Sequence, residues 1–116
     1  MRIEIKGRNV VVGDELRERV HKRCEKVARQ ISPLAVMEVE LSEERNPSIK
    51  DDQVAELTLR LKGTTLRAHC AASSMAHAVN EAVDDLARQV KRHRDKRRGR
   101  RVARGAAAAE APPAAP

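Results

Sequence analysis

The hydrophobic residues of this chain follow two different spacings in turn, and this pattern constrains the fold more than any other feature. Apolar and polar residues alternate in 2–6, 37–42, 55–62 and 66–70, which is the period of a β-strand with one buried face. Residues 14–31 instead place apolar side chains at steps of three and four, as does the segment that follows Ser74. The sequence therefore predicts the order strand, helix, three strands, helix.

One apolar face per strand and one apolar stripe per helix favour a two-layer arrangement. We expect an α+β fold, a βαβββα sandwich whose four-stranded sheet carries both helices on one face. The first two strands, joined through a helix, should be parallel, and the last three should form an antiparallel meander with a hairpin at Gly63-Thr64. The open face would carry Glu4, Glu38, Glu40 and Glu56, so an acidic sheet would oppose basic helices.

The predicted core is entirely aliphatic, because the chain contains no Phe, Tyr or Trp. The two helical stripes would supply Leu16, Val20, Cys24, Val27 and Ile31, and then Val79, Val83, Leu86 and Val90. Asp14 is a candidate cap for the first helix, and Ser73 or Ser74 for the second. Gly99 is a candidate stop for the second helix.

The charge of the chain is concentrated near its C-terminus. Residues 1–87 contain 14 basic and 15 acidic side chains, whereas residues 88–104 contain 10 basic and one acidic. Such a polycation binds phosphate surfaces by releasing condensed counterions. We expect residues 1–98 to form the folded domain and residues 99–116, basic and then rich in Ala and Pro, to form a flexible tail or linker.

Several classes of protein fit this sequence poorly. Without aromatic rings, it lacks the stacking platforms on which RNA-recognition sheets and single-strand channels depend. No apolar run approaches the roughly 20 residues that a membrane-spanning helix needs, and residues 1–6 carry no secretory signal pattern. Two cysteines are too few for a disulfide framework, which favours the reducing cytoplasm. We expect no membrane partner, because the basic run beyond Val90 has almost no apolar residues to bury in a membrane surface.

The sequence contains no convincing catalytic or metal-binding motif. His21, Cys24, His69 and Cys70 have the residue types of a zinc site, but adjacent strand residues point to opposite faces, so His69 and Cys70 should not converge. The acidic pairs at 43–44, 51–52 and 84–85 have no accompanying nucleophile. We therefore expect no enzyme activity, cofactor, metal or small-molecule substrate.

Several segments, in the right order, resemble the ribosome hibernation promoting factor family, also called ribosome-associated inhibitors. They are Lys6-Gly7-Arg8-Asn9-Val10, Glu38-Val39-Glu40-Leu41-Ser42, Glu44-Arg45-Asn46-Pro47 and the late segment Asp84 to Lys96. The resemblance covers residues 1 to about 98. It implies a βαβββα domain that binds in the decoding channel of the small ribosomal subunit, blocks the mRNA and tRNA sites and silences translation.

The resemblance also implies an RNA-binding role for basic residues of both helices. On matched positions these are Arg23 and Lys26, and then Arg88, Lys91, Arg92, Arg94 and Lys96. Lys22 and Arg29 join them because they lie on the outward face of the first helix, and Arg97 and Arg98 continue the basic run. The expected partner is the rRNA of the small subunit.

Two other functions remain open at this point. The basic segment could dock an acidic protein partner, or the domain could be a double-stranded-RNA-binding-like module with a non-ribosomal partner. The latter fold usually lacks the first strand predicted here. Long family members carry a C-terminal dimerisation domain after a linker, and this sequence stops in what resembles that linker. Dimerisation of ribosomes is therefore not expected of this chain alone, which could be a fragment.

Overall fold

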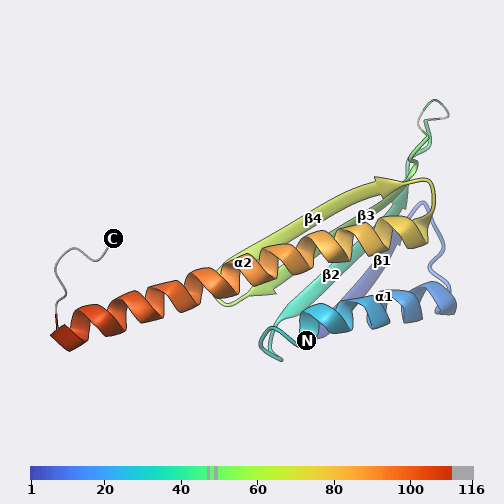
Figure 1. Cartoon of the computed structure of the whole chain (residues 1–116). Helices are drawn as coiled ribbons and strands as arrows, with labels where there is room; N and C mark the ends of the chain where they lie inside the picture. The colour runs from blue at the N-terminus through green and yellow to red at the C-terminus, as the bar shows by residue number, and fades with distance from the viewer. Residues whose placement is uncertain (47, 49, 111–116) are drawn as a thin grey trace.

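The computed structural model describes residues 1–46, 48 and 50–110, and their side chains as far as residue 96. Its strands and helices follow one another in the order that the periodicity predicts. They are β1 (Arg2–Arg8), α1 (Asp14–Ala28), β2 (Val36–Glu43), β3 (Gln53–Leu61), β4 (Thr64–Ala72) and α2 (Met75–Glu110). Both helices lie on the same face of the sheet, and α2 extends past the ends of the strands (Figure 1). The predicted α+β sandwich is therefore confirmed.

The four strands lie in the sheet in their sequence order, β1-β2-β3-β4. The first pair is parallel and the other two pairs are antiparallel, as expected from the connections. The turn between β3 and β4 contains only two residues, Lys62 and Gly63. Gly63 has a φ of 81°, a left-handed conformation that glycine adopts without a Cβ penalty. This turn aligns Leu61 with Thr64 and so fixes the register of the hairpin.

The core lies between the sheet and the two helices, and it is aliphatic throughout. Its largest fully buried side chains are Met37, Leu41, Leu57, Leu59 and Leu86. The predicted helical stripes supply most of the rest, with Leu16 and Ile31 only partly buried at the margin of the core. Each such side chain contributes roughly 1.5–3 kcal/mol when it leaves water, so many medium-sized residues replace the few large rings of a typical core.

A close backbone approach follows β1. A Cβ added at Gly7 would lie 2.5 Å from the carbonyl oxygen of Val10 and 2.9 Å from Cγ2 of Val12. Asn9 has a φ of 62°, and its Oδ1 accepts a hydrogen bond from Nη2 of Arg45 at 3.3 Å. The chain thus folds tightly back on itself here, and only glycine fits at position 7.

We expect Gly7→Ala to lower the free energy of unfolding by roughly 1–3 kcal/mol, because the carbonyl of Val10 belongs to the backbone and cannot rotate away. The measurement is urea unfolding followed by circular dichroism. Gly13→Ser is the matched control, since a Cβ at Gly13 meets nothing within 4 Å and serine is a favoured helix cap. Equal stability of the two variants would contradict the close approach.

The helix starts agree only in part with the sequence-based prediction. Ser74 caps α2, since its Oγ accepts a hydrogen bond from the backbone N–H of His77 at 3.2 Å. The prediction that Asp14 caps α1 was wrong. Gly13 occupies the cap position without a side-chain hydrogen bond, and Asp14 is the first helical residue. There the carboxylate still interacts favourably with the helix dipole.

The predicted end of the second helix at Gly99 was also wrong. α2 continues through Gly99 and Gly105 as far as Glu110. An interior glycine costs a helix only about 1 kcal/mol relative to alanine, and the neighbouring Arg and Ala residues are good helix formers. A single glycine at position 99 is therefore not enough to end the helix. The division into a domain at 1–98 and a tail at 99–116 stays a prediction, and residues 111–116 of that tail lie outside the described part of the chain.

Candidate nucleic-acid interface

The predicted cations of α1 share one surface of that helix. Lys22, Lys26 and Arg29 are exposed and Arg23 is half-buried. All four line a groove of about 500 Å³ along the helix, together with Glu15, Glu18 and Glu25. Arg19, which the sequence-based prediction did not include, lines the same groove. Its spacing of three from Lys22 and four from Arg23 was the signal that could have identified it.

The predicted cations of α2 follow the last turns that contact the sheet. Arg88, Lys91, Arg92 and Lys96 are exposed, and Arg94 is half-buried. Nη2 of Arg88 lies 3.6 Å from Oδ1 of Asp85 in an exposed ion pair, which is weak in water. Arg97 and Arg98 are helical, but their side chains lie outside the described residues.

The two sets of cations lie at the same end of the molecule, because α1 and α2 run in the same direction across the sheet (Figure 1). In α1 three of the four acidic residues come before Val20 and three of the five basic residues come after it, and Arg29 follows at the C-cap. In α2 three of the five acidic residues, Glu81, Asp84 and Asp85, precede Arg88, and Asp95 is the one acidic residue among the ten basic ones of residues 88–104. Cations near a helix C-terminus are favoured by the helix dipole. The helix layer is therefore polarised along its length.

The expectation of an acidic sheet face opposite basic helices was wrong. The open face does carry Glu4, Glu38, Glu40 and Glu56, but basic side chains lie among them. Arg2 pairs with Glu4 at 3.4 Å, Arg8 with Glu40 at 4.0 Å and Arg60 with Glu38 at 3.0 Å. The first pair lies within β1, and the other two join neighbouring strands. These arginines partly offset the repulsion between Glu4 and Glu38 and between Glu40 and Glu56, which are like-charge neighbours in the register.

The four residues that have the types of a zinc site, His21, Cys24, His69 and Cys70, do not come together. Cys24 is buried in the core, whereas His21 is exposed. Burial raises the pKa of the Cys24 thiol to about 11, so it is protonated and poorly nucleophilic at neutral pH. Cys70 packs against the core beside exposed His69, and burial also raises its pKa, with Asp85 and Glu81 adding to the effect. Across the described residues no three His, Cys, Asp or Glu side chains are grouped to hold a metal.

In the part of the chain that the structure describes, neither helix has an apolar stretch long enough to cross a bilayer.

Comparison with known proteins identifies a family that covers most of the chain. Residues 3–98 match the family described as sigma 54 modulation protein / S30EA ribosomal protein. A ribosome hibernation promotion factor of Picosynechococcus is 28% identical over 100 residues, a match that covers 85% of this chain but only 52% of that protein. A ribosome hibernation promoting factor of Salmonella typhimurium is 31% identical over 96 residues, covering 83% of this chain and 96% of that protein. The chain thus spans about half of one relative and nearly all of the other.

A solved structure shows the same architecture. The crystal structure of the N-terminal domain of Thermus thermophilus Protein Y superposes with a TM-score of 0.69 and is 29% identical to this chain. The match covers 80% of this chain and 99% of that domain.

Proposed function

The chain belongs to the sigma 54 modulation protein / S30EA ribosomal protein family, and from this membership we propose that it is a ribosome hibernation factor. In this proposal it binds the small ribosomal subunit at the decoding channel and silences translation by blocking the mRNA and tRNA sites. Its partner is structured rRNA, and it acts in the cytoplasm without catalysing a reaction. The names of the relatives from Picosynechococcus and Salmonella support the hibernation role.

The observation that carries the proposal is the position of the cations on the helix layer. Two helices that run side by side over one sheet face both become basic toward the same end. Structured RNA presents phosphates on curved surfaces, and a rigid basic surface can recognise that shape without reading bases. The absence of aromatic residues from the chain fits this kind of binding, which needs no stacking.

The proposed contact residues are those that the sequence indicated, with Arg19 added from the groove along α1. In α1 they are Arg19, Lys22, Arg23, Lys26 and Arg29, and in α2 they are Arg88, Lys91, Arg92, Arg94, Lys96, Arg97 and Arg98. The side chains of the first ten project from the helix layer rather than from the open sheet face, where arginine and glutamate pair with each other. We therefore propose that the helices, and not the sheet, face the rRNA.

Co-sedimentation with separated ribosomal subunits tests the proposal. The purified chain should pellet with small subunits and not with large ones, and the bound fraction should fall steeply as salt rises from about 50 to 200 mM. It should also inhibit peptide synthesis in a cell-free system at concentrations at which it binds. Folded protein that neither pellets with small subunits nor inhibits synthesis would contradict the proposed function.

A further inference from the structure

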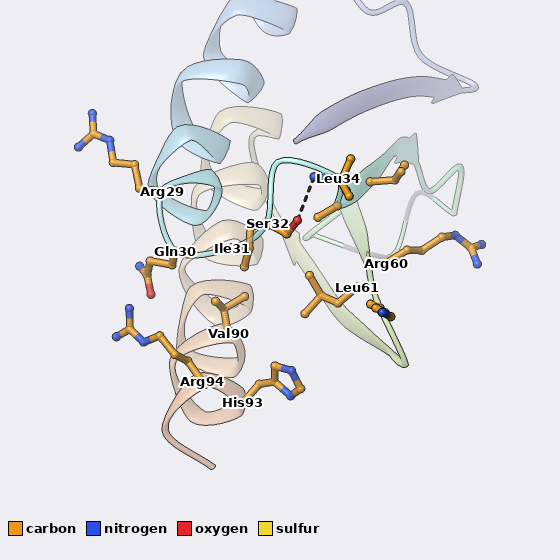
Figure 2. A pocket seen from close by; sticks show the side chains of 13 residues that line it. Arg29, Gln30, Ile31, Ser32, Leu34, Arg60, Leu61, Val90, His93 and Arg94 are labelled. Carbon is orange, nitrogen blue, oxygen red and sulfur yellow. Dashed lines mark hydrogen bonds between the residues drawn. The ribbon is translucent and has the colours of Figure 1, made fainter. Parts of the chain in front are cut away.

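A second surface feature lies at the end of the domain where three elements meet. The chain that leaves α1, the turn between β3 and β4, and the middle of α2 enclose an open groove of about 830 Å³ (Figure 2). This volume is within the range of about 300–1,000 Å³ that is usual for binding pockets. The lining residues lie far apart in the sequence, so the groove exists only in the folded domain.

The groove has an apolar floor and one fully exposed apolar side chain at its margin. Ile31 and Leu61 are half-buried and line the groove together with the buried Val90. Leu34 is 89% exposed. Its backbone is nevertheless fixed, since its N–H donates to Oγ of Ser32 at 3.1 Å and the next N–H, of Ala35, donates to the carbonyl of Ser32 at 3.1 Å. The turn thus holds a leucine in water beside an apolar floor.

The charged side chains around this floor all have the same sign. Arg29, Arg60, Lys62 and Arg94 line the groove, and none of the described residues that line it is acidic. Arg60 already pairs with Glu38 at 3.0 Å and points away from the floor (Figure 2). Nε of Arg94 is buried and has no hydrogen-bond partner among the described residues. Apart from Arg60, the cations of the groove have no ion pair among the described residues, and they lie next to an apolar surface that is partly exposed.

We propose that this groove binds an acidic, amphipathic segment of a partner protein. Aliphatic or aromatic side chains of that segment would cover Leu34, Ile31 and Leu61, and its carboxylates would pair with Lys62, Arg29 and Arg94. Charge complementarity selects an acidic partner over a basic one. The apolar floor favours a peptide over RNA, because phosphate groups cannot cover Leu34. The described lining contains no Phe, Tyr or Trp ring on which a base could stack, and the imidazole of His93 is its one aromatic ring.

This inference goes beyond the proposed ribosome binding, with which it shares two residues. Arg29 and Arg94 belong to both surfaces, so an acidic segment in the groove would compete with rRNA for them. Leu34 and Lys62 belong to the groove alone. Substitutions at these two positions therefore separate peptide binding from ribosome binding.

Fluorescence anisotropy with a defined probe tests the proposal. The probe is a short fluorescein-labelled peptide of alternating glutamate and leucine pairs, and its controls replace either all glutamates by lysine or all leucines by serine. We expect the probe to bind the full chain and both controls to bind at least about tenfold more weakly. Leu34→Ser and Lys62→Glu should each weaken binding of the probe about tenfold. The first removes an apolar contact with the leucines of the probe, and the second replaces an ion pair with its glutamates by repulsion.

Matched variants elsewhere on the surface control for general effects. Val11→Ser changes a side chain that is 93% exposed, and Lys50→Glu makes the same charge reversal outside the groove. Both should bind the probe like the unmodified chain. Leu34→Ser should also pellet with small ribosomal subunits as well as the unmodified chain does.

Three results would overturn the proposal. They are no binding of the probe, equal effects of Leu34→Ser and Val11→Ser on it, or loss of ribosome binding by Leu34→Ser, which would assign the groove to the RNA-binding surface. If the chain binds the probe but not ribosomes, the groove proposal stands and the hibernation proposal fails, so the two are tested separately.

Discussion

A variant in which Arg88, Lys91 and Arg92 are all replaced by glutamate is expected to bind small ribosomal subunits about a hundredfold more weakly, or worse. All three side chains are exposed on α2, at the start of the basic run that occupies residues 88–104. Each phosphate contact contributes to both the affinity and its salt dependence, and a glutamate at the same position adds repulsion. Co-sedimentation and a salt titration measure the loss, and the slope of the titration should also become shallower.

The same variant should remain folded, because none of the three side chains contributes to the core. Substitutions at such exposed positions usually change stability by less than about 0.5 kcal/mol each. The matched control reverses Lys6, Lys50 and Arg67, which are also exposed but lie outside α1 and α2. It changes the net charge by the same amount and should retain most of the affinity. Equal losses in the two variants would mean that net charge, and not the helix layer, determines binding.

The second large effect is expected for Leu86→Asp, which should unfold the domain. Leu86 is 0% exposed and lies on the stripe of α2 that packs against the sheet. An aspartate there would bury an unpaired charge among aliphatic side chains, or would lose core packing if protonated, and either costs several kcal/mol. A domain of this size has only about 5–15 kcal/mol of stability in total.

Circular dichroism and urea unfolding check this expectation. Leu34→Asp is the control, because it makes the same chemical change at a side chain that is 89% exposed. That control should unfold at nearly the same urea concentration as the unmodified chain. A cooperative transition of unchanged midpoint in Leu86→Asp would show that the α2 stripe is not part of the core.

The fold could be predicted from the sequence because each element signals itself locally. Met37, Val39 and Leu41 alternate with polar residues, and all three are buried on the helix side of β2. The stripe through Val79, Val83, Leu86 and Val90 likewise marks the buried side of α2. The spacing of apolar residues within one strand or helix determines which of its faces is buried, whichever element packs against it. The element order then left few ways to pack the layers.

The features that the sequence did not reveal depend on the register or on distant contacts. The pairing of Arg60 with Glu38 requires strands that are 22 positions apart to align, which periodicity does not determine. The clash that excludes a side chain at Gly7 depends on how the chain folds back at Val10. The groove beside Leu34 combines residues near positions 31, 61 and 90, and no local pattern in the sequence joins them.

The same direction of α1 and α2 has a kinetic consequence. A molecule whose acidic and basic residues are separated along its helices experiences a torque in the potential of a large polyanion. It would turn its basic end toward the polyanion during diffusion, before any contact forms, and fewer encounters would fail through wrong orientation. Added salt should then lower the association rate constant by a larger factor than it raises the dissociation rate constant.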